Sequence, residues 1–222
     1  MAIAHVQTVN SGGLSVGTIS ATLTLTAGNA VVVNLLTYSQ AVTPTQTAGD
    51  TLTIRKDFVS GGLRINQYDS LSVAGGSTTF TFTFATVSAV RIFVTEISGL
   101  AKSAAFDVSA DGGADTTSTT HSSGTTATTA QANEICIAAM NSDGAGGSGS
   151  NTVSQSFTIP TNGDAPGTDS GGLKSTLAYK IVSATGTFET TFTSLSTDGD
   201  AIICTYKAAV LLVSTFGLMG VG

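Results

Sequence analysis

The sequence contains few side chains that could carry out catalysis. Its two histidines are His5, in an apolar segment near the N-terminus, and His121, in a segment rich in Ser and Thr. A serine hydrolase needs a histidine base beside an exposed serine, and no Gly-x-Ser-x-Gly motif marks a turn from a strand into a helix. We therefore expect a protein that is not an enzyme and that needs no cofactor.

Carboxylates offer a second chemistry, the binding of a cation. Zinc needs three or four His, Cys or acidic ligands at close spacing, and the sequence has no such cluster. Calcium takes six to eight oxygens, and Asp198 and Asp200, on either side of Gly199, are the first candidates to supply them. Asp and Gly form ordinary turns equally well, because Asp side chains cap turns. We expect no metal site, with Asp198 and Asp200 as weak calcium candidates.

The glycine-rich segment 142–149 and the two cysteines have plain structural interpretations. The segment has no lysine and precedes no helical pattern, so it predicts a loop rather than a phosphate-binding site. Cys136 and Cys204 stand in apolar segments, which favours buried and reduced thiols. A disulfide between them would require their two strands to be neighbours.

Composition and charge exclude several classes of protein. The 222 residues include 10% charged and 41% hydrophobic side chains, and the net charge is -6. Basic residues are scattered, so we expect neither a nucleic-acid interface nor a polybasic membrane patch. The hydrophobic content excludes disorder, and the scarcity of Glu, Lys, Leu and Arg disfavours helices. Segments rich in Thr and Val then favour an all-β protein.

Alternating and apolar segments define the expected strands. In Thr79–Phe84, period two places three phenylalanines on one face. Ala30–Tyr38 is largely apolar, as in a strand covered on both faces, and Ser60–Gly62 predicts a hairpin turn. Asp111–Thr129 has no bulky apolar residue, which predicts a long loop or an exposed edge. The remaining expected strands are Thr22–Thr26, Thr51–Val59, Leu63–Tyr68, Val90–Ile97, Glu134–Met140, Val153–Ile159, Leu173–Val182, Thr187–Thr193 and Ala201–Lys207.

A faint internal repeat relates the two halves of the chain, about 20–110 and 125–207. Three pairs of segments match, namely Thr26–Val33 with Ala130–Ile137, Gly76–Phe84 with Gly186–Thr193, and Arg91–Val94 with Ile202–Thr205. Each half is too small and too open to seal its own core. We therefore expect one sandwich over residues 1–207, in which both halves contribute strands to each sheet. Two tandem domains are the alternative, with Asp111–Thr129 as the boundary.

The C-terminal segment 208–222 has no charged side chain and is strongly apolar. It is too short to span a bilayer comfortably, and Lys207 prevents its extension toward the N-terminus. An exposed apolar segment invites association, so we expect a last strand and tail buried against another subunit, with burial in its own domain or contact with a membrane as alternatives. The predicted interface residues are Val210, Leu211, Leu212, Val213, Phe216, Leu218 and Met219.

Several segments resemble a group of tailed-bacteriophage virion proteins with jelly-roll sandwiches. They are Thr26–Asn29 before an apolar strand, Gly75–Phe84, Glu96–Leu100 and Ala178–Gly186. The resemblance implies an all-β, two-sheet antiparallel jelly-roll β-sandwich displayed on a virion, often as a homotrimer. The N-terminus has no signal-peptide pattern, so we expect synthesis in the host cytoplasm without export.

Three functions follow from this resemblance and from the missing catalytic motifs. The first is a capsid decoration (cement) protein, which binds the major capsid protein or other virion proteins and stabilises the head. The second is a tail or head-fibre module that binds a host receptor or a carbohydrate. The third is a calcium-dependent accessory to a carbohydrate enzyme. The first is the preferred hypothesis.

Overall fold

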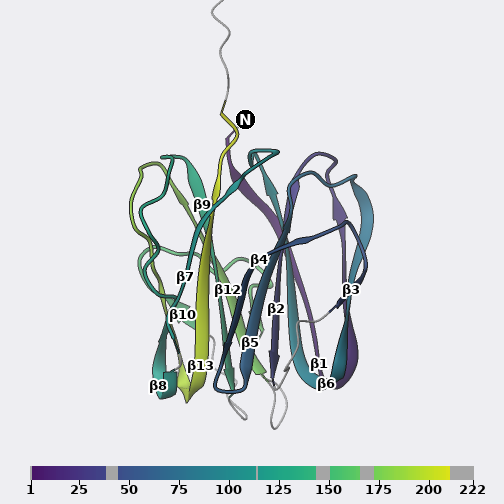
Figure 1. Cartoon of the computed structure of the whole chain (residues 1–222), viewed down its shortest axis with the longest axis vertical. Helices are drawn as coiled ribbons and strands as arrows, with labels where there is room; N and C mark the ends of the chain where they lie inside the picture. The colour runs from purple at the N-terminus through teal and green to yellow at the C-terminus, as the bar shows by residue number, and fades with distance from the viewer. Residues whose placement is uncertain (1, 39–44, 114, 144–150, 166–172, 211–222) are drawn as a thin grey trace, which may run out of the picture.

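Two antiparallel sheets pack face to face in the computed structural model of the chain (Figure 1), which describes residues 2–38, 45–113, 115–143, 151–165 and 173–210. The described residues form strands and connecting turns. The strands are β1 (Ala4–Leu25), β2 (Ala30–Tyr38), β3 (Thr45–Ala48), β4 (Thr53–Ser60), β5 (Leu63–Ser70), β6 (Gly76–Ser98), β7 (Phe106–Asp111), β8 (Asp115–Ser122), β9 (Glu134–Asp143), β10 (Thr152–Val153), β11 (Asp164–Ala165), β12 (Leu173–Val182) and β13 (Thr191–Lys207).

The predicted fold class is confirmed, since the molecule is an all-β sandwich of antiparallel sheets, consistent with the jelly-roll type. The first sheet has the order β1-β6-β2-β5-β4, with β3 also paired to β6. The second has the order β10-β13-β9-β12-β11, with β7 and β8 also paired to β13. The prediction that both halves contribute strands to each sheet is wrong. Each half forms one sheet, since β1 to β6 all belong to the first sheet and β7 to β13 all belong to the second.

The faint sequence repeat corresponds to a repeat of topology. β2 lies between β6 and β5 in the first sheet, as β9 lies between β13 and β12 in the second. The short strands β3 and β10 pair with β6 and β13, and the edge strands β4 and β11 pair with β5 and β12. The long β1 is represented in the second half by two strands, β7 and β8, both along β13.

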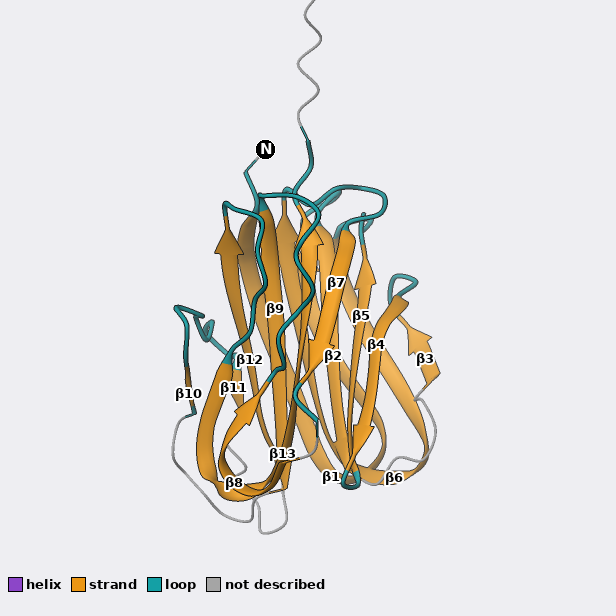
Figure 2. Cartoon of the chain, turned by 60° about the vertical axis from the view of Figure 1, so that its left-hand side comes forward, coloured by secondary structure: helices purple, strands orange, loops and turns teal. Residues whose placement is uncertain are grey.

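Three layers of apolar side chains explain how each half seals a core of its own. One layer lies between the sheets, and each sheet also covers a separate cluster on its outer face. The outer clusters are enclosed because the strand pairs β1–β6 and β8–β13 curl round, as seen at the lower end of Figure 2. Phe80, Phe82 and Phe84 all lie in the outer cluster of the first sheet, which confirms the predicted alternation. β2 is buried on both faces, as predicted.

The largest differences from the expected strands concern the second half. Segment 111–129, predicted as a long loop or an exposed edge, contains β8, which in the described part of the chain pairs with β13 alone and therefore fits the second alternative. Of the expected strand at 153–159, only Val153 belongs to a strand, β10, and β13 begins at Thr191 rather than Thr187. The hairpin turn is confirmed at Gly61 and Gly62, whose φ values of 53° and 87° suit glycine. The predicted loop at 142–149 lies largely outside the described residues.

Candidate functional site

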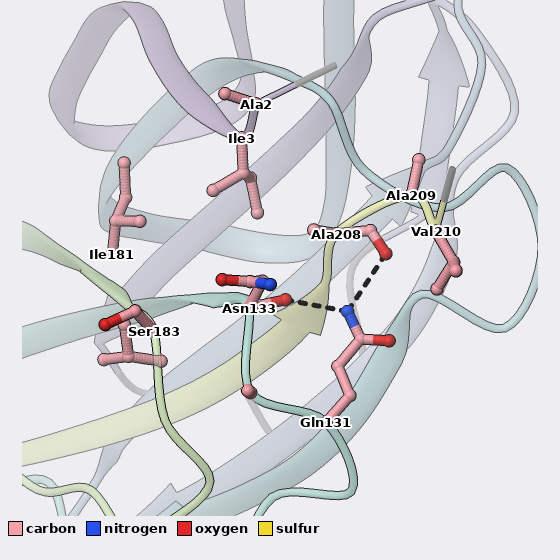
Figure 3. Close-up of a pocket in the computed structure, with 11 residues that line it drawn as sticks. Ala2, Ile3, Gln131, Asn133, Ile181, Ser183, Ala208, Ala209 and Val210 are labelled. Atoms are coloured by element: carbon pink, nitrogen blue, oxygen red, sulfur yellow. Dashed lines mark hydrogen bonds between the residues drawn. The ribbon is translucent and has the colours of Figure 1, made fainter. Parts of the chain in front are cut away.

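An open pocket of about 750 Å3 lies at the end of the sandwich where β13 gives way to the C-terminal segment (Figure 3). Three parts of the second half and the two residues just before β1 surround it. Its lining residues are Ala2, Ile3, Gln131, Ala132, Asn133, Ile181, Val182, Ser183, Ala208, Ala209 and Val210. Most of these side chains are aliphatic and none is charged, so the pocket suits an apolar occupant rather than an ion or a polar substrate.

The chain that leaves the sandwich forms one wall of this pocket and is held on both sides. The Ala208 N–H donates to the Asn133 carbonyl at 2.9 Å, and the Ala209 N–H donates to the Gly99 carbonyl at 2.8 Å. The Gln131 side-chain amide donates to the carbonyls of Asn133 and Ala208 (Figure 3). These bonds hold the backbone of Ala208 and Ala209 in place along the pocket.

Two large apolar side chains on the rim of the pocket are exposed to solvent. Ile181 has 45% of its surface exposed and Val210 has 72%. They lie on different sides of the pocket in Figure 3, with Ile3 between them. Scattered exposed aliphatic residues are ordinary on protein surfaces, but two on the rim of one apolar pocket form a patch suited to a protein partner.

The edge of β12 at this pocket has outward-facing backbone groups. The Leu177 N–H donates to the Gly163 carbonyl, and Tyr179 exchanges two hydrogen bonds with Thr158. Because alternate residues of an antiparallel strand direct their backbone groups to the same side, the N–H and C=O of Ile181 also point away from β9. β11 covers only Ser175 and Thr176 of β12, so within the described residues no strand continues along this edge to Ile181.

A pair of buried carboxyl groups lies directly behind the pocket. Asp107 accepts a hydrogen bond from the Ala130 N–H at 2.6 Å and lies 3.5 Å from the Lys207 ammonium. Glu134, next to the pocket residue Asn133, is fully buried, and neither of its oxygens has a hydrogen bond of ordinary geometry within the described residues. Burial and the adjacent Asp107 raise the pKa of Glu134 to about 7. Burial opposes ionisation of Asp107 too, but the Ala130 N–H and Lys207 outweigh it and lower its pKa.

The histidines do not form a recognisable active site. His121 lies in β8 and is fully buried, with Nε2 3.2 Å from the Ser194 hydroxyl. A histidine beside a serine is the start of a catalytic pair, but neither residue lines either of the two pockets described here. The close packing of Gly199 against the His121 ring explains the glycine, since a Cβ there would lie 2.5 Å from the ring.

His5 contributes to a second, more polar pocket of about 590 Å3, which lies between β1 and residues 158–162. Its ring stacks on Tyr179, with centroids 4.6 Å apart, and its Nε2 lies 2.8 Å from the Thr8 hydroxyl. Burial lowers the pKa of His5. Asn162 closes the pocket by donating to the Thr8 carbonyl. The stacked rings therefore join the two halves of the sandwich.

The two acidic candidates for calcium, Asp198 and Asp200, lie two residues apart on β13. Asp198 is exposed, whereas Asp200 is 2% exposed. Within the described residues, no three His, Cys, Asp or Glu side chains are grouped so that they could hold a metal ion. Cys136 and Cys204 are buried free thiols, as predicted, and burial raises the pKa of both, that of Cys136 to about 12.

The predicted interface is described only at its first residue. Val210 lies on the pocket rim, and the other predicted interface residues, Leu211, Leu212, Val213, Phe216, Leu218 and Met219, lie outside the described residues. The sequence did not predict the pocket. Its lining comes from four separate segments, of which only the last is conspicuously apolar in the sequence.

No family model, curated protein or solved structure matches the chain. In the part of the chain that the structure describes, no helix is long and apolar enough to cross a membrane. The pocket, the apolar sequence that follows Val210 and the resemblance in sequence are therefore the features that bear on function.

Proposed function

We propose that the protein is a non-enzymatic structural protein of a tailed-phage virion, most specifically a capsid decoration protein that binds the head shell as an oligomer. The observation that carries this proposal is the apolar pocket with Ile181 and Val210 exposed on its rim, and Val210 is followed in sequence by the uncharged apolar segment 211–222. Such a surface suits contact with protein. The major capsid protein and further copies of this chain are the proposed partners.

The energetics of such a role are those of apolar burial. Each Å2 of apolar surface removed from water stabilises a complex by about 25 cal/mol, before the costs of association are subtracted. A surface with few charges loses little by desolvation when neighbours cover it. A decoration protein of this kind strengthens the shell because neighbouring subunits must separate from it before they separate from one another.

A test of the proposal compares virions with and without the protein. Particles that lack it are expected to release their DNA at a lower temperature and after milder osmotic shock, and adding purified protein back is expected to restore resistance. Quantitative mass spectrometry of purified particles is expected to give hundreds of copies per virion. Equal resistance of the two kinds of particle would contradict the decoration role.

The second pocket favours the alternative function, a tail or head-fibre module that binds a receptor. It presents amide, hydroxyl and aromatic groups together, among them Gln7, Thr8 and Tyr179, and this mixture is typical of sites that bind sugars. A few copies per particle, together with a signal on a glycan array that His5→Ala removes, would favour this alternative. A decoration protein is expected to give no such signal.

A further inference from the structure

We propose that the pocket beside Val210 is the receptor for the apolar C-terminal segment of a second copy of this chain, which adds to the free edge of β12. This inference rests on the proposed assembly function and names the contact through which copies associate. The occupant is residues 211–222 of a neighbouring protomer, and the acceptor is the described pocket around Ile181.

The chemistry of the segment matches that of the pocket. Pocket-lining residues are neutral and largely aliphatic, and the segment after Lys207 has no charged side chain. Exposed Ile181 and Val210 remain to be covered, and an apolar strand with alternate large side chains covers such a rim. The sequence Leu211–Val213 supplies three aliphatic residues in succession, of which alternate ones would face the pocket.

The backbone of the acceptor supplies the second part of the recognition. Outward-pointing groups of Leu177 and Tyr179 are already bonded to Gly163 and Thr158, whereas β12 continues past them to Ile181 on the pocket rim. A strand that pairs with Ile181 would satisfy its outward N–H and C=O. Strand addition of this kind combines main-chain hydrogen bonds with side-chain pockets, so it is selective for extended segments that are apolar at alternate positions.

The direction of the chain favours a second copy over the segment of the same protomer. Hydrogen bonds to Asn133 and Gly99 fix Ala208 and Ala209 as the wall of the pocket. A segment that leaves along the wall must reverse to enter its own pocket, and the first glycine beyond Val210 is Gly217. Of the residue types that dominate tight turns, residues 211–216 contain only Ser214 and no Gly, Asn, Asp or Pro. A neighbouring protomer meets no such constraint.

Donor segment and acceptor pocket are different parts of the chain, so the contact between copies is either exchanged within a pair or repeated head to tail. Two copies that exchange segments make a two-fold dimer, and three copies that each donate to the next make a closed trimer. Both arrangements satisfy every segment and every pocket. The trimer agrees with the oligomer implied by the sequence resemblance.

A mixing experiment with two complementary variants tests this inference. The chain ending at Val210 keeps the pocket but lacks the donor segment, and full-length Ile181→Asp keeps the segment but places a charge in the pocket. Ile54→Asp is the matched control, because Ile54 is the same residue type, is 42% exposed and lies away from the pocket on β4. Thermal unfolding of each variant verifies that its sandwich is folded.

Light scattering coupled to gel filtration supplies the readout. The wild type and Ile54→Asp are expected to be oligomers, each altered chain alone is expected to be a monomer, and an equimolar mixture of the two is expected to form a heterodimer. We expect Ile181→Asp to weaken self-association by at least about tenfold. A wild-type mass for folded Ile181→Asp, or a monomeric wild type, would overturn the inference.

The particle assay separates this inference from the function on which it rests. If Ile181→Asp is oligomeric and still protects virions against heat, the proposed contact is wrong and the decoration role stands. If Ile181→Asp is monomeric and virions resist heat equally with and without the wild-type protein, the contact is correct and the decoration role is wrong.

Discussion

The two halves share a topology, but their corresponding ends differ. In the first half, β4 pairs with β5 over nearly all of its length, from Ser60 with Leu63 to Thr53 with Asp69. In the second half, the corresponding strand β11 covers only two residues of β12. β5 is thus covered along nearly its whole length, whereas within the described residues no strand covers the end of β12 at Ile181, beside the pocket. β4 is itself an open edge of the first sheet, but the uncovered end of β12 is the one that borders the apolar pocket, and the contact proposed above places an added strand there.

Each half also has a cluster of polar side chains at this end, and the two clusters differ in the number of carboxyl groups that they contain. The two halves can be aligned on a pair of core residues in each sheet. Ala30 pairs with Ile97 in the first sheet, and Ile135 pairs with Tyr206 in the second. In this alignment Asn29, before Ala30, corresponds to Glu134, and Glu96, before Ile97, corresponds to Thr205. Gln7, opposite Glu96, then corresponds to Asp107 in the bulge opposite Thr205.

In the first half one carboxylate is surrounded by donors. Glu96 accepts from the Gln7 side chain at 2.6 Å, from the Thr26 N–H at 2.8 Å and from the Asn29 side chain at 2.7 Å. Burial acts to raise its pKa, but these hydrogen bonds outweigh it and hold the pKa below the ordinary value. In the second half two carboxyl groups stand where the amides stand in the first. The first cluster stabilises the fold, and the second weakens it when both groups ionise.

The largest expected effect tests the stabilising cluster. Glu96→Leu removes the acceptor of three N–H groups and leaves them without partners, so we expect the free energy of unfolding at pH 7 to fall by about 3 kcal/mol. Urea unfolding measures this change. The control is Glu189→Leu, since the Glu189 carboxylate bonds Thr125 and Gln155 at the surface and its loss should matter far less. Similar losses for both variants would contradict the comparison.

The next prediction concerns Glu134, whose replacement is expected to stabilise the protein at high pH, whereas replacement of Glu96 destabilises it. The raised pKa of Glu134 favours its protonated form in the folded state, so its stabilising contribution is complete below about pH 4.5 and is lost as the pH rises through about 7. We expect Glu134→Gln to be more stable than the wild type at pH 8, by on the order of 2 kcal/mol, and similar to it at pH 4.5. Urea unfolding at the two pH values measures the difference. Equal stability of the two proteins at pH 8 would show that Glu134 ionises without cost.

Glu96 is expected to give the reverse pH dependence. Because its pKa is lowered in the folded protein, its contribution is present above about pH 4.5 and is lost as the pH falls further. The wild type should therefore lose stability in acid, and Glu96→Leu should lose less over the same interval. Thermal unfolding between pH 3 and pH 6 tests this prediction, and parallel curves for the two proteins would refute it.

The smallest effect is expected at the salt bridge of the second cluster. Lys207→Met removes the cation 3.5 Å from Asp107, and because the Lys207 side chain is 23% exposed, we expect a loss of stability below about 1 kcal/mol at pH 7. The same change should raise the pKa of the neighbouring Glu134 further, since less positive charge then faces the carboxyl pair. NMR titration of the Glu134 carboxyl carbon would detect the shift, and a lower pKa would contradict it.

The sequence predicts the local elements of this fold well. The bounds of β2 and β12 are those of the predicted apolar segments, and the Phe alternation of β6 indicates its buried face correctly. Periodicity is a property of neighbouring residues, so it reports which face of a strand is covered. It does not report which strands pair, and the distribution of strands between the sheets was accordingly predicted wrongly.

The site was predicted only in part for the same reason. Val210 stands in a conspicuous apolar segment, but Ile3, Asn133 and Ile181 meet it only through long-range pairing. Glu134 looks like an ordinary residue before a strand, and its partner Asp107 belongs to another strand of the sheet. The sequence repeat aligned Asn29 with Asn133, whereas the shared core aligns it with Glu134. A shift of one residue exchanges the two faces of a strand and conceals such a pair.

A disulfide cross-linking experiment tests the central claim, that the end of β12 at Ile181 pairs with the C-terminal segment of a neighbouring copy. One preparation carries only Ile181→Cys and the other only Leu212→Cys, while the native Cys136 and Cys204 are buried. We expect oxidation of the mixture to yield a covalent dimer of one chain of each kind, and oxidation of either preparation alone to yield little dimer. The account would be contradicted if the mixture gave no mixed dimer and a chain that carries both substitutions formed an internal disulfide instead.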